Sequence, residues 1–469
     1  MNHFSILFYS YWPGQRPVRM TLVCQSVIRG AFPYPLNISP VHRLVPRGSR
    51  LSLIAFMGGF SLAGSTSAMC ESILRHHGFS TGFYSSPHLV AVRERIRLNG
   101  RVISEDQFAH YFHEIYDMLD GFEGDMPKYF SFLTVMAFNV FLREKIDVAI
   151  VEVGIGGIVD YTNILRKVPV VGITALGLDH TSILGTTLPE IAAAKAGIIK
   201  PGCEAYTVPQ PPDAMEVLKS CPLTTVPDYN AYTFPNEPRS HLPVDLQAYS
   251  TNASLAIQLA HAWMRITKHR RNGIKHKDIK GYNGEKPNGV IDTAIVRMVS
   301  SETAEGLRSC KWPGRYHVVD SDYAKFCLDG AHTKESMEIC AEWFRNNNQL
   351  QDKLLIFSAT GDRNAEVLLS PLQSIGFKKV FFVVPTAYKN ITQKNDNYSK
   401  VEQEELISRC QSHADLWRGC DGAEVAVLAC VSDALISIKR MEHKSSVLIT
   451  GSLHLVGAAL SILDPNLSS

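Results

Sequence analysis

The chain has 469 residues, 45% of them hydrophobic and 20% charged, so it is long enough for two or three packed domains and too apolar to be disordered. Its formal net charge of +2 argues against a nucleic-acid-binding protein. No apolar stretch reaches the roughly 18 residues of a transmembrane helix, and the 10 cysteines contain no C-x-x-C pair. The cysteine spacing predicts neither a zinc site nor a disulfide framework and favours a reducing compartment.

Residues 1–50 differ in composition from the rest of the chain. The first acidic residue is Glu71, and six arginines and many serines precede it. An acid-free start rich in arginine and serine resembles a mitochondrial transit peptide and predicts a mitochondrial or cytoplasmic location, or both. The same segment contains six prolines, which suit no long amphipathic helix. Mistranslated or mis-spliced sequence is therefore a second interpretation.

Residues 51–311 are predicted to form a first α/β domain. An apolar run over 53–57 predicts a strand, and a helix is expected from Thr66 to about His77 with Ser65 as its N-cap. The next predicted elements are a strand over 81–84, a strand-like segment with Arg93, Arg95 and Arg97, a helix over 104–119 that opens on a capping box, and a helix over 130–144. The alternating arginines either rim an anionic substrate or form a solvated strand face.

The most informative segment is 147–163, which reads DVAIVEVGIGGIVDYTN. An apolar run of strand length ends at Glu152, and glycines follow at once. An acid at the carboxyl end of a buried parallel strand lies where open α/β sheets bind ligands. A lone carboxylate suits Mg²⁺, which in nucleotide sites takes one or two carboxylates plus phosphate oxygens. On this segment alone, an ordinary strand followed by a glycine turn is an equal alternative.

Further along, residues 170–176 predict a second buried strand that leads to His180, and a helix beginning near Leu188 carries Lys195. A helix is expected over 249–263, with Asn252 near its start. Residues 268–309 show poor periodicity and are interpreted as an insertion or linker.

Residues 312–469 are predicted to form a second, smaller doubly wound domain. Its expected strands are 326–328, 354–358, 379–384 and 447–450, and its expected helices are 334–345, 364–373 and 432–441. Asp329 follows the first of these strands, again at a carboxyl end.

Six motifs occur in a fixed order: SSPHL at 85–89, GLDHT at 177–181, KAGIIK at 195–200, WPGR at 312–315, DGAHT at 329–333 and TGSLHLVG at 450–457. Together they resemble the folylpolyglutamate synthase family of the Mur ligase superfamily, over roughly Gly64 to the C-terminus. The resemblance implies an N-terminal P-loop-type ATPase domain with a mostly parallel sheet and a smaller Rossmann-like C-terminal domain.

The resemblance also implies the site residues. Ser86, Glu152 and His180 are implied as Mg²⁺ ligands, and Glu152, His180 and Lys195 as catalytic residues, with Lys195 carbamylated. The implied ATP contacts are Gly64, Ser65, Asn252, Arg315, Asp329 and His332, and His454 is implied near an incoming glutamate. A monovalent cation such as K⁺ is a further expected cofactor. A structural histidine and a surface lysine are the ordinary alternatives for His180 and Lys195.

The chain departs from the family at the phosphate loop. The family reads G-T-K-G-K-G-S, whereas residues 59–65 read G-F-S-L-A-G-S. Ala63 takes the place of the phosphate-binding lysine and Leu62 that of a glycine. Phosphate loops need glycines for close backbone approach and a lysine for charge, so ATP binding is expected to suffer.

The resemblance implies ATP-dependent addition of L-glutamate to the γ-carboxyl of folate glutamates through an acyl phosphate, by a monomer. Folate, L-glutamate and ATP are the expected partners. Because of the altered loop, a catalytically impaired folate-binding relative or a mis-spliced product is one alternative. A relative with another acceptor, such as dihydropteroate or a cell-wall peptide, is another.

Overall fold

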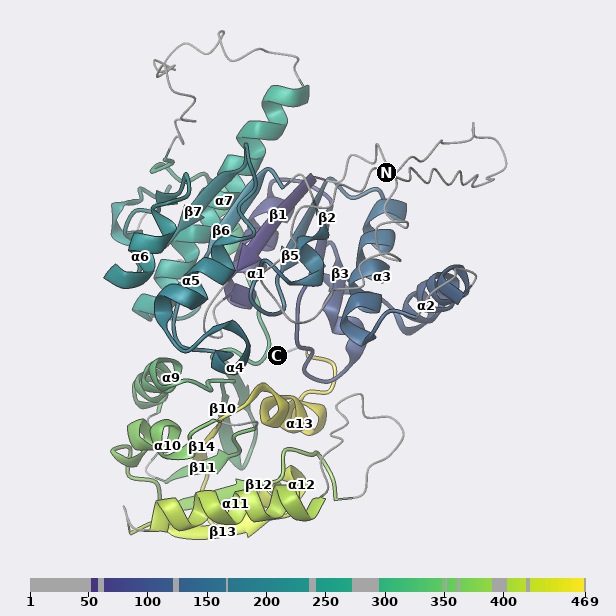
Figure 1. Ribbon diagram of the computed structural model, residues 1–469. Helices are drawn as coiled ribbons and strands as arrows, with labels where there is room; N and C mark the ends of the chain where they lie inside the picture. The colour runs from purple at the N-terminus through teal and green to yellow at the C-terminus, as the bar shows by residue number, and fades with distance from the viewer. Residues whose placement is uncertain are drawn as a thin grey trace.

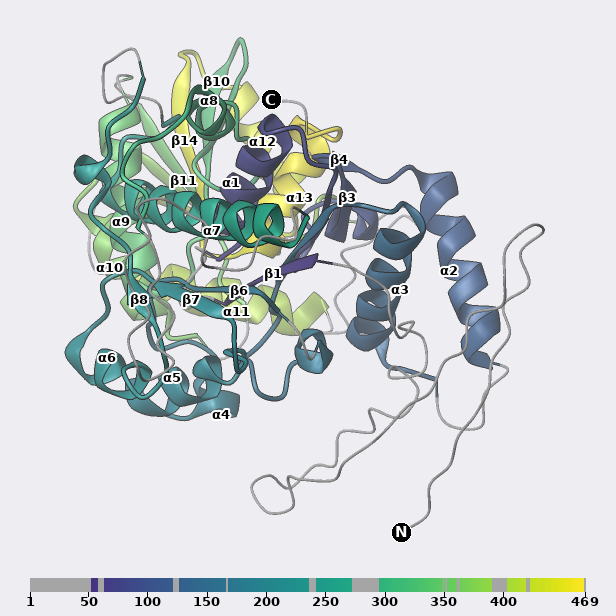
Figure 2. The same ribbon diagram turned by 90° about the horizontal axis from the view of Figure 1, so that it is seen from above.

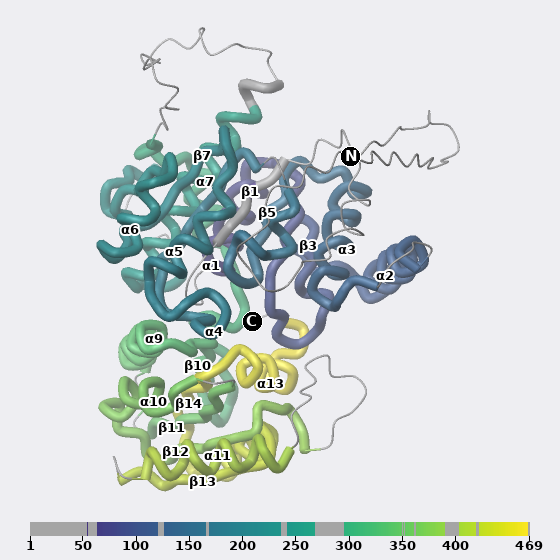
Figure 3. The backbone as a smooth tube through the Cα atoms, in the orientation of Figure 1, coloured from purple at the N-terminus to yellow at the C-terminus, as the bar shows by residue number. Residues whose placement is uncertain are grey.

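The computed structural model describes residues 52–57, 63–120, 126–165, 168–235, 242–271, 295–348, 350, 352–360, 363–389, 403–418 and 422–467. Within these residues the chain forms two α/β domains, each built on a mostly parallel sheet (Figure 1). The backbone runs from the first domain, purple to teal, into the second, green to yellow (Figure 3). The predicted fold class is confirmed.

In the described residues, the sheet of the first domain has eight strands in the order β4-β3-β2-β5-β1-β6-β7-β8. Strands β3 and β4 are antiparallel, and the other six are parallel. The bounds are β1 (Ser52–Met57), β2 (Thr81–Tyr84), β3 (Ile96–Leu98), β4 (Arg101–Val102), β5 (Val148–Glu152), β6 (Val170–Ile173), β7 (Glu204–Thr207) and β8 (Thr224–Thr225). The carboxyl ends of β2, β5, β1 and β6 therefore meet at one edge.

Helices cover both faces of this sheet, and β5 shows why. Val148 and Ile150 belong to the same apolar core as α1 and α7, whereas Ala149 and Val151 belong to the core that contains α3. A strand buried on both faces is apolar throughout, as the sequence is here. The α-helices are α1 (Ala63–His76), α2 (Glu105–Asp120), α3 (Tyr129–Arg143), α4 (Thr181–Leu184), α5 (Leu188–Ala196), α6 (Pro212–Leu218), α7 (Gln247–Arg271) and α8 (Ser301–Arg308). Helix α2 stands away from the body beside α3 (Figure 2).

The described part of the second domain has six strands in the order β13-β12-β11-β14-β10-β9, of which only β9 is antiparallel. The strands are β9 (His317–Asp320), β10 (Ala324–Leu328), β11 (Lys353–Phe357), β12 (Lys379–Val383), β13 (Glu424–Leu428) and β14 (Ser445–Thr450). The helices are α9 (Lys334–Asn347), α10 (Ala365–Gln373), α11 (Gln403–Arg418), α12 (Val431–Lys439) and α13 (Leu453–Leu463). One face packs on α9, α10 and α11, and the other on α12 and α13.

Three local predictions are wrong. Ser65 is not the N-cap of the first helix, because α1 already begins at Ala63. Arg93 and Arg95 lie in a short 3-10 helix (Val92–Arg95), and only Arg97 is in a strand. The reason is local: the Glu94 carboxylate accepts hydrogen bonds from the backbone N–H groups of residues 89–91 and closes a turn there.

The third prediction, an insertion or linker over 268–309, is wrong at its two ends, and residues 272–294 lie outside the described residues. Helix α7 extends through Arg271, and α8 forms within the supposed linker. The side chain of Ser300 caps α8 by accepting from the N–H of Thr303. The Ser300 cap can be recognised in the sequence, but a helix of eight residues is too short to show a clear helical pattern. No helix in the described parts of the chain combines the length and apolar character of a membrane span.

Helix α8 lies against α1 with almost no space between the two backbones. A Cβ added at Gly306 would lie 2.6 Å from the Ile73 Cα atom and 2.9 Å from its backbone nitrogen. We expect Gly306→Ala to lower the free energy of unfolding by about 1–3 kcal/mol, because the two helices must separate. Thermal unfolding measures this. Gly422→Ala is the control, since nothing lies within 4 Å of its Cβ position, and equal losses in the two variants would contradict the prediction.

Candidate active site

Polar residues that follow or end three strands of the first sheet face one cavity of about 580 Å³. Glu152 ends β5, Ser86 follows β2, and His180 follows β6. The backbone N–H of Ser86 donates to the Glu152 Oε2 atom over 3.1 Å. All three side chains proposed for the metal thus line the same cavity, although the described residues hold no cluster of three histidine, cysteine, aspartate or glutamate side chains suited to a metal.

Burial changes the acidity of Glu152. It raises the pKa of the carboxyl to about 7, against the opposing effects of the Ser86 N–H and the cations Arg315 and Arg95. No salt bridge from Glu152 to a cation is found among the described residues. Such a carboxyl group gains from a cation that arrives with a ligand.

Lys195 lies in the last turn of α5 and faces the same cavity. Thr187 and Glu190 form a capping box that begins this helix, and Lys195 is only 3% exposed. Burial lowers the pKa of its amine to about 8, although Asp179 and Asp160 oppose the shift. The amine is therefore much closer to its neutral, nucleophilic form than a surface lysine.

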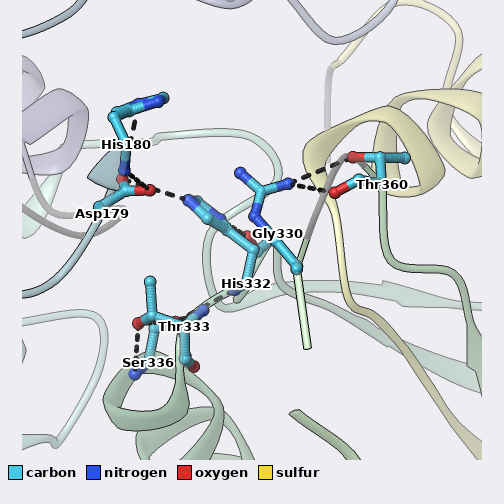
Figure 4. A network of polar contacts seen from close by, with 8 residues as sticks. Asp179, His180, Gly330, His332, Thr333, Ser336 and Thr360 are labelled. Atoms are coloured by element: carbon cyan, nitrogen blue, oxygen red, sulfur yellow. Dashed lines mark hydrogen bonds and ion pairs between the residues drawn. The ribbon is translucent and has the colours of Figure 1, made fainter. Parts of the chain in front are cut away.

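Asp179 links the two domains (Figure 4). Its Oδ2 atom lies 3.6 Å from the Nε2 atom of His180 and 3.9 Å from that of His332, which belongs to the second domain. The His332 Nδ1 atom is 2.7 Å from the Gly330 carbonyl oxygen. Burial lowers the pKa of His332 to about 4, so this imidazole is neutral near pH 7. Asp179 belongs to the GLDHT motif, but the sequence predicted no role for it.

A second cavity of about 340 Å³ lies between the domains. Ser65 and Asn252 come from the first domain, and Arg315 and Asp329 from the second. Among the described residues, no hydrogen-bond partner is found for three buried atoms here: Ser65 Oγ, Asn252 Nδ2 and Arg315 Nη1. Buried polar groups are nearly always paired, so three in one cavity indicate a polar ligand.

Arg315 lines both cavities and joins them into one site. The first cavity also contains Gly64 and His332 from the predicted set. His454 lines neither cavity and is exposed on α13. Residues 58–62, which carry most of the altered phosphate loop, lie outside the described residues.

The first sheet presents an acid and a helix start to a cleft that an arginine from the second α/β domain also borders. Together with the relatives described next, this arrangement identifies the chain as an ATP-dependent ligase. Residues 315–462 match the family model described as dihydrofolate synthetase, C-terminal domain. The chain is 36% identical to the mitochondrial folylpolyglutamate synthase of Cricetulus griseus, over 86% of this chain and 82% of that one. The same identity holds for the mitochondrial enzyme of Homo sapiens, over 89% and 84%. The chain belongs to the folylpolyglutamate synthase family.

A solved structure of Mycobacterium tuberculosis folylpolyglutamate synthase has the same fold. It superposes with a TM-score of 0.67 at 22% identity, over 91% of this chain and 95% of that one.

Proposed function

We propose that this enzyme joins L-glutamate to the γ-carboxyl of a folate's terminal glutamate, with ATP as co-substrate and an acyl phosphate as intermediate. The observation that carries the proposal is the pair of cavities that share Arg315, one with unpartnered buried polar atoms and one with Glu152 and Lys195. The relatives are named folylpolyglutamate synthases, and the Mycobacterium tuberculosis protein was solved with ADP and AMPPCP. These names support the substrates.

ATP fits the second cavity, with its base near Asn252 and its phosphates directed past Ser65 into the first cavity. A carboxylate oxygen of folate attacks the γ-phosphorus atom, and ADP leaves. The amine of glutamate then attacks the acyl carbon, phosphate leaves, and the amine loses a proton. The protein positions these groups and stabilises charge on the transferred phosphoryl group, for which Arg315 provides a guanidinium across the cleft.

Ser86, Glu152 and His180 would hold Mg²⁺. One carboxylate beside a hydroxyl fits an ion that keeps waters and phosphate oxygens in its shell, whereas imidazole is a less usual ligand for it. When bound, the ion would neutralise phosphate charge. A monovalent cation stays a prediction without assigned residues.

The proposal is tested by incubating the full chain with ATP, Mg²⁺, glutamate and a reduced folate. We expect stoichiometric ADP and a folate longer by one glutamate, detected by mass spectrometry. Dihydropteroate in place of folate tests the alternative acceptor. Extension of dihydropteroate but not of folate would overturn the assigned acceptor.

We also propose that Lys195 is carbamylated in the active form, because its depressed pKa favours the neutral amine that reacts with CO₂ and the nearby metal residues suit an anion there. We expect Lys195→Ala to be inactive and partly restored by a small carboxylic acid such as acetate. Lys200→Ala is the control, since Lys200 belongs to the same motif but lines neither cavity. An unmodified Lys195 in a well-ordered structure of the enzyme with ATP and Mg²⁺ bound would contradict the prediction.

We further propose a mitochondrial location, a cytoplasmic one, or both, since two relatives are named mitochondrial enzymes. The division at residues 50 and 311 and the monomeric state also remain proposals. The two sheets support the second division, because the first ends at Thr225 and the second begins at His317.

A further inference from the structure

Arg97 on β3 carries a charge that the protein itself satisfies poorly. Its guanidinium lies 4.8 Å from the Trp312 ring centre and 6.0 Å from that of Phe83. Its one hydrogen bond among the described residues runs from Nε to the Glu94 carbonyl oxygen and is long, at 3.4 Å. No carboxylate in the described residues forms an ion pair with it. Desolvation lowers the pKa of this half-buried group, and a cation partly withdrawn from water without an anionic partner is costly.

Arg97 and Trp312 stand in the wall between two cavities. They line the large active-site cavity and also a smaller one of about 140 Å³ beside it. The smaller cavity is further lined by Arg75, Lys311 and Glu71. The Glu71 carboxylate is already engaged, since it accepts from Arg75 Nε over 3.2 Å and from the Thr81 hydroxyl. The small cavity is therefore cationic overall and suited to an anion.

We propose that this small cavity binds an α-carboxylate of the folate's γ-linked glutamyl chain, a step that rests on the proposed function. Every glutamate of such a chain keeps a free α-carboxylate, while the terminal γ-carboxyl reacts. With the reacting group near Glu152 in the large cavity, Arg97 borders both spaces and can hold the carboxylate of the preceding glutamate.

The side-chain chemistry favours a carboxylate over a neutral group. A guanidinium offers two parallel N–H donors that match the two oxygens of a carboxylate. The Trp312 ring, whose centre lies 4.8 Å from the guanidinium carbon, holds this side chain beside the cavity before the substrate arrives. Lys311, which is exposed at the cavity, adds a second, more mobile charge. The site would make a diglutamate a better substrate than a monoglutamate, which lacks the preceding carboxylate.

The test uses the full chain with mono-, di- and triglutamate forms of one reduced folate at saturating ATP and glutamate. We expect Arg97→Met to raise KM for the di- and triglutamates by about 10-fold or more, the worth of a charge-assisted hydrogen bond, with KM for ATP unchanged. Lys311→Met should shift KM in the same direction by a smaller factor. Arg101→Met is the matched control, because Arg101 is exposed on the neighbouring strand β4 and lines none of these cavities.

An equal rise in KM for mono- and diglutamate in both variants would overturn the proposal. If Arg97→Met does not fold, the proposal is tested instead with Lys311→Met and with a γ-linked triglutamate peptide that lacks the pteridine. This peptide should bind the wild-type chain in calorimetry and bind Lys311→Met more weakly. Equal competition by inorganic phosphate would indicate a general anion site and count against a glutamyl subsite. A chain that extends no folate would refute the proposed function, while the peptide titration would still test the cavity.

Discussion

Replacement of Glu152 by glutamine is expected to lower turnover by about 10²–10³-fold without loss of the fold. Glutamine has the same shape and can still accept the Ser86 N–H, but it removes the charge that would meet Mg²⁺. The measurements are kcat with saturating ATP and folate, and the temperature of unfolding. Glu144→Gln is the control, since Glu144 is exposed, lines neither cavity and accepts a hydrogen bond from the Tyr111 hydroxyl. Near-normal turnover of Glu152→Gln would refute the metal role.

The same variant gives a pH test. With a pKa of about 7, the Glu152 carboxyl of the metal-free protein is largely protonated below that pH, so Mg²⁺ binding should strengthen as pH increases through 7. Because the folded pKa exceeds the ordinary value of 4.5, the protonated form favours folding. This contribution to the free energy of unfolding is fully present below about pH 4.5 and is lost as the pH rises through about 7. Glu152→Gln should lack both slopes, and identical profiles in variant and wild type would argue that the carboxyl does not titrate in this range.

The second large effect concerns the phosphate loop. Rebuilding residues 59–65 as G-T-K-G-K-G-S, with a family-like segment before them, is expected to raise ligase activity by about 10²–10³-fold. Ala63 is the first residue of α1, is 6% exposed, and lines the active-site cavity, so a lysine at this position would add charge where phosphates are expected. Glycine in place of Leu62 would let backbone N–H groups approach them.

Activity of the original and rebuilt chains is compared by ATP- and glutamate-dependent folate extension. Ala63→Met controls for added bulk without charge. High and equal activity in both chains would show that another cation replaces the lysine. Absence of activity in both would favour the impaired, folate-binding alternative, which the relatives do not support.

The strand ends could be predicted from the sequence, because an apolar run of strand length that stops at a polar or turn residue is a strong signal. Glu152 ends a fully apolar run, and Ser86 follows a short strand between turn residues, so chain order and sheet geometry place them together. Elements stabilised mainly by tertiary neighbours could not be read in this way. The missed strands and helices include β7, β8, β13, α6 and α11, which are short or weakly patterned.

Contacts between the domains were beyond sequence reasoning for a different reason. Asp179 and His332 meet only because the second domain docks at one particular angle on the first. Likewise, Arg97 borders two cavities together with Trp312, which is distant from it in the sequence. Local pattern identifies such residues as polar or aromatic but says nothing about which distant side chain they will face.

The placement of α8 against α1 has a consequence for synthesis on the ribosome. All strands of the first sheet have been made once Thr225 is translated, yet Ile73 on α1 is covered by Gly306, which comes much later. A nascent chain paused between these points would expose an apolar helix face to water. The first domain therefore cannot bury this face of α1 until α8 has been made and has left the ribosome, and slow synthesis of residues 226–308 would prolong a state prone to aggregation.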